Sequence, residues 1–305
     1  MLGDDTDPEE PPTLAELRAA MASTESMRRD GCMGETGALL PQLIRGARTA
    51  AHACIGRDRA AANSVLAVAY QVAATTLTAL GKEDAAFTAM ERSLAAIREC
   101  DGPHLKTLAA STLSWALTEQ GRLADAERVA LAGAQRIEPG FRSDPQDLAL
   151  WGVLLLRAAT AAVRQEKHDT VADLLRMAKG AAESMGEDLL VYATPFGPTN
   201  AGIAKVNFLV ETERPEEAIR SARTVPDLDS LPPTWRARFH VDRALAYNDL
   251  GRDRASESAL LLAEADAPEW MRYHSTTRRL VEELRGRASR RDAVLGPADR
   301  LGLAG

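Results

Sequence analysis

A short turn recurs five times along this 305-residue chain, and it constrains the fold more than any other feature. In the clearest copies a Gly follows an apolar stretch and precedes a small Ala or Ser by five residues, as at Gly81, Gly121 and Gly251. Weaker copies centre on Lys167 and Glu213, so that subtraction places successive turns 40, 46, 46 and 38 residues apart. Gly can end an α-helix in the left-handed conformation without steric cost. Recurrence at this period therefore predicts stacked helical hairpins.

A single amphipathic hairpin cannot bury its apolar face, so neighbouring hairpins must stack. The layout resembles the tetratricopeptide repeat, although most of the aromatic positions of that repeat hold other residues here, such as Glu83 and Leu123. We therefore expect an all-α fold, an α-solenoid of degenerate tetratricopeptide-like hairpins over residues 13–288. An acidic tail is expected over residues 1–12 and a second tail over residues 289–305. No change in composition divides the solenoid.

Two further helices are expected over residues 14–28 and 37–55, with the glycines between them in a loop. Ser143 or Asp144 is expected to cap a helix that begins at Pro145. Thr199 or Asn200 is expected to cap the helix after Pro198 in the same way.

Charge and cysteine content narrow the class of protein. The chain has 44 Asp and Glu against 37 Lys and Arg, and this balance excludes a generally basic nucleic-acid binder. Three scattered cysteines without a CxxC pair fit a reducing cytosol. No uninterrupted apolar stretch reaches the ~18 residues of a membrane span, and 148–163 comes nearest. We expect a cytoplasmic protein without a membrane segment.

The segment Phe196-Gly197-Pro198-Thr199-Asn200 carries a more specific resemblance. It is similar to an F-G-P-x-N stretch before a repeat helix in actinobacterial transcriptional regulators of the XRE (helix-turn-helix) type. Residues 231–285 resemble the same C-terminal region. The resemblance implies a sensing and dimerisation module, so it implies a homodimer that binds a ligand in a concave groove.

The chain departs from these regulators in its first 60 residues, which contain no helix-turn-helix. Either a DNA-reading segment belongs to a longer chain, or the protein has none. In both cases we expect no DNA binding by this chain alone.

In a tetratricopeptide hairpin the first helix lines the concave face, through positions spaced i, i+4 and i+7. Hydrogen-bonding groups on such a wall suit a polar or anionic ligand. Alignment of the hairpins on their turns gives most of the predicted ligand-binding residues. Asn200 is added because it lies seven residues, almost two helical turns, before Asn207. The predicted residues are Gln71, Thr75, Ser111, Trp115, Thr118, Arg157, Arg164, Asn200 and Asn207. The alternative is that they are the less apolar faces of packed helices.

No standard motif for a metal, a nucleotide or a nucleophile is present, so we expect no cofactor and no metal site. The sequence predicts a regulatory protein that binds a small molecule or peptide. Two alternatives stay open: a scaffold for a separate regulator or biosynthetic subunit, and an enzyme that uses the groove on a natural-product intermediate.

Overall fold

The computed structural model describes residues 10–100, 102–140, 143–192 and 194–288. Within these residues fourteen α-helices follow one another with almost no strand, which confirms the all-α, solenoid-like prediction. The predicted tails at 1–12 and 289–305 lie, apart from residues 10–12, outside the described part. Contacts divide the chain into two compact units, and each is described by itself.

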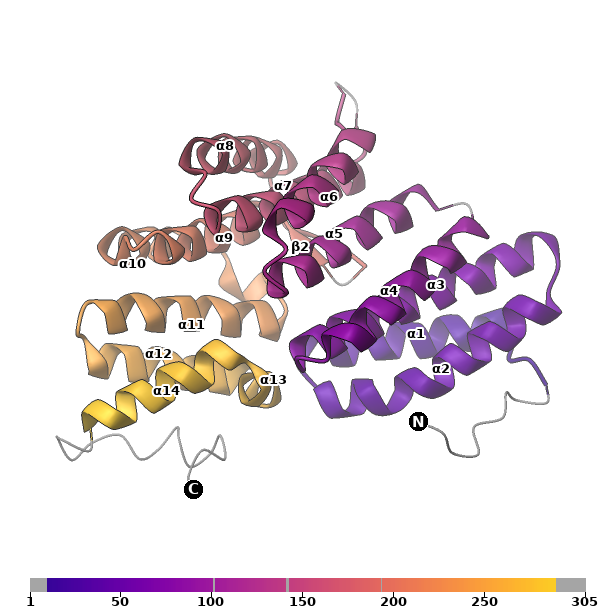
Figure 1. Cartoon of the computed structure of the whole chain (residues 1–305), viewed down its shortest axis with the longest axis horizontal. Coiled ribbons are helices and arrows are strands. Elements are labelled where there is room, and N and C mark those ends of the chain that lie inside the picture. Colours follow the sequence, from indigo (N-terminus) through magenta and orange to yellow (C-terminus); the bar gives the residue numbers. More distant parts are fainter. Residues whose placement is uncertain (1–9, 101, 141–142, 193, 289–305) are drawn as a thin grey trace. The chain divides into compact units, whose positions relative to one another are not determined.

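Unit 1 comprises the described residues of 1–28 and 33–138. Its helices are α1 (Leu14–Arg29), α2 (Met33–Ala53), α3 (Gly56–Ala79), α4 (Glu83–Arg98), α5 (Pro103–Glu119) and α6 (Leu123–Arg136). The helices α3 and α4 pack as one antiparallel pair and α5 and α6 as the next (Figure 1). The first helices of the two pairs, α3 and α5, also contact each other.

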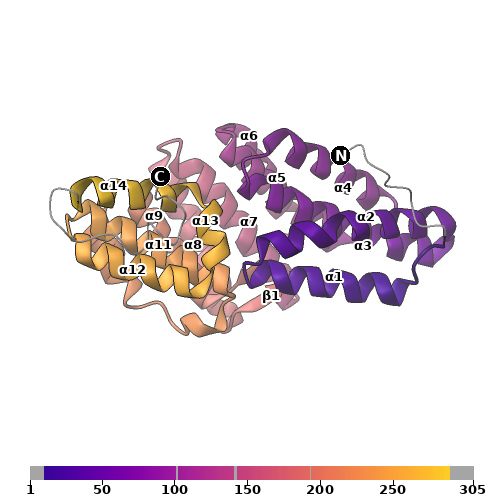
Figure 2. The same cartoon turned by 90° about the horizontal axis from the view of Figure 1, so that it is seen from below.

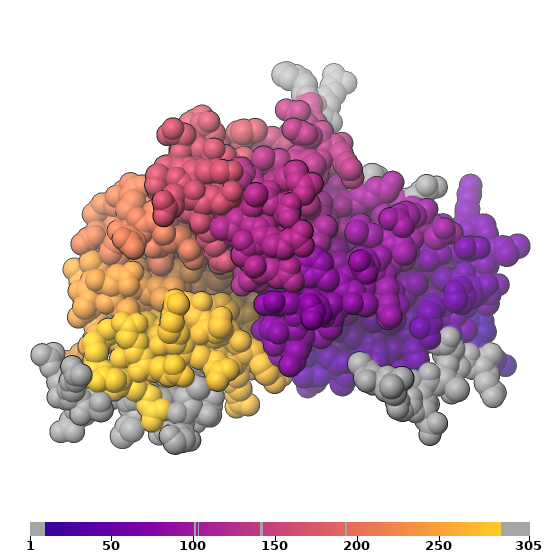
Figure 3. Space-filling model, in the orientation of Figure 1, coloured from indigo at the N-terminus to yellow at the C-terminus, as the bar shows by residue number. Residues whose placement is uncertain are grey.

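Unit 2 comprises residues 29–32 and the described residues from 139 onward. Its helices are α7 (Pro145–Val163), α8 (His168–Met185), α9 (Pro198–Glu211), α10 (Pro215–Ala222), α11 (Pro233–Asp249), α12 (Asp253–Asp266), α13 (Pro268–Tyr273) and α14 (Ser275–Ala288). The pairs α7–α8, α9–α10 and α11–α12 are hairpins, and α9 contacts both α7 and α11 (Figures 1 and 2). On the face drawn in Figure 3, the yellow helix α14 lies at the surface of unit 2.

The predicted glycine turns have the expected backbone. Gly81, Gly121 and Gly251 have φ angles of +66°, +73° and +66°, in the left-handed region. After each, the next N–H donates to the carbonyl five residues earlier, as from Arg122 to Leu117 at 2.9 Å. This bond satisfies a carbonyl that the helix end would leave unpaired.

Glutamate takes the left-handed position in the two weaker turns. Glu213 has φ +55° where the sequence predicts it, but at the third turn the left-handed residue is Glu166, with φ +59°, and not Lys167. The Lys167 N–H donates to the Ala162 carbonyl at 3.1 Å, as its counterparts do. The predicted alignment of the third turn is therefore wrong by one residue.

Gly31 forms a further turn of this kind, with φ +82°. The helix α2 begins at Met33, soon after it, so the helix expected over residues 37–55 is present but begins four residues earlier, and the prediction of a loop at Gly34 is wrong.

The residue five positions after each left-handed residue lies in the core of its hairpin. These residues are Ala86, Ala126, Val171, Ala218 and Ser256, and all are buried. The Ser256 hydroxyl donates to the Ala244 carbonyl of the partner helix at 2.8 Å, which requires close helix approach.

Two short antiparallel strands, β1 (Leu189–Val191) and β2 (Thr194–Phe196), precede α9, with Leu189 opposite Phe196. The Phe196 ring is fully buried against Gly152 of α7, where an added Cβ would lie 1.9 Å from the ring. The Asp188 carboxylate accepts from the N–H groups of Thr199 and Asn200 at 2.9 and 3.0 Å. Asp188 therefore caps α9, and the prediction that Thr199 or Asn200 does so is wrong.

At α7 the predicted cap is confirmed, because the Asp144 carboxylate accepts from the Gln146 N–H at 2.8 Å. Among the described residues, α3 and α7 are the helices long and apolar enough for a membrane span by length and composition. Their apolar windows are 72% and 61% buried inside the described structure.

Candidate functional site

The left-handed residues define equivalent positions on the first helix of every hairpin. The side chain six residues before the left-handed residue of each turn is half-buried, whereas many neighbouring positions on the same helix are buried. We call this set the middle positions: Thr75, Trp115, Thr160, Asn207 and Leu245. Three were predicted. In the third hairpin the position is held by Thr160, because the turn there lies one residue earlier than expected.

The same shift moves Arg157 and Arg164 out of register with the other predicted residues. Arg157 is half-buried and Arg164 is exposed. Leu156 and Val163 stand at the positions that the corrected turn defines. Arg157 is thus one residue removed from the equivalents of Gln71 and Ser111.

In unit 1 the predicted residues lie on the contacting helices α3 and α5. Thr75 and Thr118 use their hydroxyls within their own helices, donating to the Val72 and Ser114 carbonyls at 2.9 and 2.8 Å. Ser111 is buried and Trp115 half-buried.

Gln71 has an unusual environment within unit 1. Its side chain is buried, and neither its Nε2 nor its Oε1 has a hydrogen-bond partner among the described residues. A buried amide without partners costs on the order of 1–3 kcal/mol for each unsatisfied group. Gln71 therefore retains one donor group and one acceptor that a bound group could satisfy.

In unit 2 the sequence-predicted Asn207 meets a residue that sequence reasoning missed. Its Nδ2 donates to Oδ1 of Asp242 at 3.1 Å, which joins α9 to α11. Asn200 is buried at the start of α9, with its backbone N–H bound to Asp188. The signal for Asp242 was an acid between the apolar residues Val241 and Ala244 of α11, but its partner is 35 residues away along the chain.

Asp242 is buried, and its Oδ2 has no partner in the described chain. Burial raises the pKa of Asp242 to about 6, while the nearby Arg238 and the Asn207 hydrogen bond act in the opposite direction. Glu211 adds a small upward contribution to this pKa. The carboxyl group therefore changes charge near neutral pH.

A second polar cluster joins α11 to α12. Arg236 forms an ion pair with Asp266 at 2.7 Å, and Nε2 of His240 lies 3.6 Å from the same carboxylate. Nδ1 of His240 accepts from Arg243 at 3.0 Å, so the ring carries its proton on Nε2. Burial and the Arg243 charge lower the pKa of His240 to about 4. Nδ1 is occupied by Arg243 and Nε2 faces the Asp266 carboxylate without a hydrogen bond at this distance.

His274 lies between α13 and α14 and has one nitrogen to spare. Its ring stacks on Trp270, with the ring centres 4.3 Å apart, and Nδ1 lies 3.0 Å from the Thr277 hydroxyl. The same hydroxyl lies 3.6 Å from the Met271 sulfur, and the tautomer of His274 sets which of the ring and the hydroxyl donates to the other. Burial, then the Arg238 charge, lowers the pKa of His274 to about 4. The ring is therefore neutral at pH 7.

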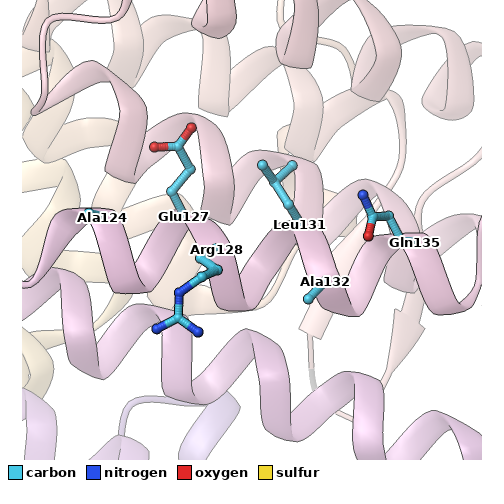
Figure 4. A pocket seen from close by; sticks show the side chains of 6 residues that line it. All are labelled: Ala124, Glu127, Arg128, Leu131, Ala132 and Gln135. Atoms are coloured by element: carbon cyan, nitrogen blue, oxygen red, sulfur yellow. The ribbon is translucent and has the colours of Figure 1, made fainter.

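A shallow pocket of about 350 Å³ lies along α6 and contains none of the predicted residues. Its lining residues are Ala124, Glu127, Arg128, Leu131, Ala132 and Gln135. In Figure 4, Glu127, Leu131 and Gln135 project from one side of the helix and Arg128 from the other. Since these groups all come from one helix, the pocket has no converging walls.

The sequence matches no protein-family model, and it matches no curated protein.

Proposed function

We propose that this protein is a tetratricopeptide-like regulatory protein that binds a small molecule or peptide on the first helices of its hairpins. The proposal includes action as a homodimer, in keeping with the resemblance to the sensing modules of XRE-type regulators.

The observation that supports binding is the half-buried state of the middle positions, four of which hold polar or aromatic side chains. Thr75 and Trp115 lie on contacting helices in unit 1, as do Thr160 and Asn207 in unit 2. Beside them, Gln71 and Asp242 retain unused hydrogen-bonding atoms within the described chain. A protein that only packed its helices would gain stability by replacing these two groups with apolar ones.

The experiment is a thermal-shift screen of the whole chain against metabolites and short peptides. A ligand present at 100 times its Kd stabilises the folded state by about 2.7 kcal/mol. We expect at least one ligand to raise Tm, and we expect Thr75→Val or Asn207→Ala to reduce the shift.

Thr88→Val is the matched control. Thr88 also bonds to a carbonyl of its own helix, Asp84 at 3.0 Å, but it is exposed on the second helix α4. Equal losses in Thr75→Val and Thr88→Val would argue against binding at the middle positions. A screen without any stabilising ligand, together with an intact complex with a protein partner, would favour the scaffold instead. Light scattering of the purified chain measures whether it is dimeric.

A further inference from the structure

We propose that Asp242 is a positioning residue for Asn207 and that the proton on its carboxyl group controls this role. The ionised carboxylate holds the Asn207 amide with its carbonyl oxygen available to a ligand, whereas the protonated carboxyl group occupies that oxygen. The inference rests on the proposed function, in which Asn207 is one of the middle positions that meet the ligand.

A hydrogen bond joins the two side chains. Nδ2 of Asn207 donates to Oδ1 of Asp242 at 3.1 Å, where α9 and α11 are in contact. An ionised carboxylate only accepts hydrogen bonds, so the Asn207 amide must turn its NH2 group, and not its carbonyl oxygen, toward Asp242. The bond therefore fixes the orientation of an amide whose two ends differ in hydrogen-bonding character.

Each side chain keeps one oxygen that no described residue uses. Oδ2 of Asp242 is buried and receives no hydrogen bond from the described part of the chain. The carbonyl oxygen of Asn207 also lacks a described donor, and this side chain is half-buried. Because a carboxylate and a carbonyl oxygen repel each other, the Asn207 oxygen is favoured on the side away from the ionised Asp242. In this orientation it is an acceptor for a hydroxyl or N–H group of a ligand.

Protonation turns Asp242 from an acceptor into a group that also donates. A carboxyl group and a primary amide pair through two parallel hydrogen bonds. In this pair the amide N–H still donates to Oδ1 of Asp242, and the new O–H at Oδ2 donates to the Asn207 carbonyl oxygen. Both ends of the Asn207 amide are then engaged, so a ligand reaches the carbonyl oxygen only by breaking a hydrogen bond.

The surroundings of Asp242 place this change close to neutral pH. Its carboxyl group is buried with a neutral donor as its described partner, and burial raises its pKa to about 6. Arg238, one turn earlier on α11, and the Asn207 hydrogen bond favour the ionised form. Glu211 of α9 favours the protonated form.

Other helices also pack against α11, but their described charged residues are not among those that shift the Asp242 pKa. These helices are α10 and α12, which contact α11, and α13 and α14, which share its apolar core. Several of their charged residues form ion pairs: Arg214 with Glu217, Asp266 with Arg236, and Arg287 with Asp253 and Glu283. The pKa values of His240 and His274 are about 4, so both rings are mainly neutral while Asp242 titrates.

The test is NMR spectroscopy of the whole chain labelled with 15N and 13C, which follows the Asn207 side chain from pH 5 to pH 8. Its absence in Asn207→Ala assigns the signal. We expect the amide protons and the carbonyl carbon of Asn207 to titrate with a midpoint near pH 6, together with the Asp242 carboxyl carbon. In Asp242→Asn the new amide donates at every pH. The Asn207 signals should therefore stay constant, close to their low-pH positions in the wild type.

Asp249→Asn is the matched control, because Asp249 is another acid of α11 whose pKa is raised by burial. The titration of Asn207 should persist in this variant. Constant Asn207 signals in the wild type, an unchanged titration in Asp242→Asn, or loss of the titration in Asp249→Asn would each overturn the proposal. Circular dichroism checks that each variant is folded, and the wild-type titration decides the question if Asp242→Asn does not fold.

Failure of this inference is distinct from failure of the proposed function. Constant Asn207 signals, together with a stabilising ligand whose effect Thr75→Val reduces, would leave the proposed function in place and overturn the role of Asp242. A titration near pH 6 that Asp242→Asn abolishes would support the role of Asp242 even if the thermal-shift screen found no ligand.

Discussion

Ionisation of Asp242 places a negative charge where only one of its two oxygens receives a hydrogen bond from a described residue. Its folded-state pKa of about 6 lies above the usual 3.8 of an unfolded chain. Between these values the unfolded chain releases its proton first, so the free energy of unfolding falls as pH rises from about 4 to about 6. The stability contribution of Asp242 is complete below pH 4.

We predict that Asp242→Asn removes this dependence. The wild type should lose up to about 3 kcal/mol relative to the variant between pH 4 and pH 7, from two pKa units at about 1.4 kcal/mol each. Urea unfolding at a series of pH values measures the difference. The comparison with the variant matters because His240 and His274, whose pKa values are lowered, destabilise the folded chain as pH falls below 6.5. Parallel pH profiles for the two proteins would contradict the prediction.

At the scale of the element, a glycine in a hairpin turn differs in backbone conformation from a glycine within a helix. Gly121 has φ +73°, whereas Gly180 lies exposed within α8, and neither has an atom within 4 Å of an added Cβ. We predict that Gly121→Ala destabilises the protein by about 1 kcal/mol, since a left-handed L-residue costs about 1–2 kcal/mol. Gly180→Ala should stabilise it by about 0.5–1 kcal/mol through helix propensity. Denaturant midpoints measure both changes.

A third variant tests the turn that the sequence misplaced. Glu166 already adopts the left-handed conformation at φ +59°, so Glu166→Gly should stabilise the chain or leave it unchanged. Destabilisation by about 1 kcal/mol or more would show that Glu166 is not strained.

The contact between Phe196 and Gly152 fixes the β-hairpin against α7. We predict that Gly152→Ala costs several kcal/mol, because its methyl group would lie 1.9 Å from the Phe196 ring. In the double variant with Phe196→Ala the clash is absent, so the cost of Gly152→Ala should fall below about 1 kcal/mol. A double-mutant cycle of unfolding free energies measures the coupling, and additive losses would contradict it.

The elements that the sequence predicted well are those with local signals. Gly81, Gly121 and Gly251 mark helix ends because only glycine adopts their conformation without strain. The third turn was misplaced because its left-handed residue, Glu166, is not a glycine. Glutamate adopts the left-handed conformation only when the packing of both helices requires it. The β-hairpin was missed because two three-residue strands have no periodicity to detect. The Asn207–Asp242 bond was missed because it depends on how α9 and α11 meet.

At the scale of the whole molecule, the charge balance leads us to expect no binding to nucleic acid. Its net charge is −7, and the arginines near the end of α14 have carboxylate partners, since Arg287 pairs with Asp253 and Glu283 at 3.2 and 2.8 Å. We predict that the chain does not retard duplex DNA in a gel even at about 50 mM salt, where phosphate contacts are strong. Retardation that Arg287→Gln abolishes would contradict this.

The middle positions give five hairpins one half-buried side chain each, on the first helix of the hairpin. Thr, Trp, Asn and Leu all occupy this position, although they differ in volume and polarity. On the proposed binding surface, a substitution at one of these positions would alter one helix at a cost in stability that stays local, as repeat proteins allow. The specificity of such a protein can therefore be altered one hairpin at a time, by design or by mutation, while the remaining hairpins keep their contacts.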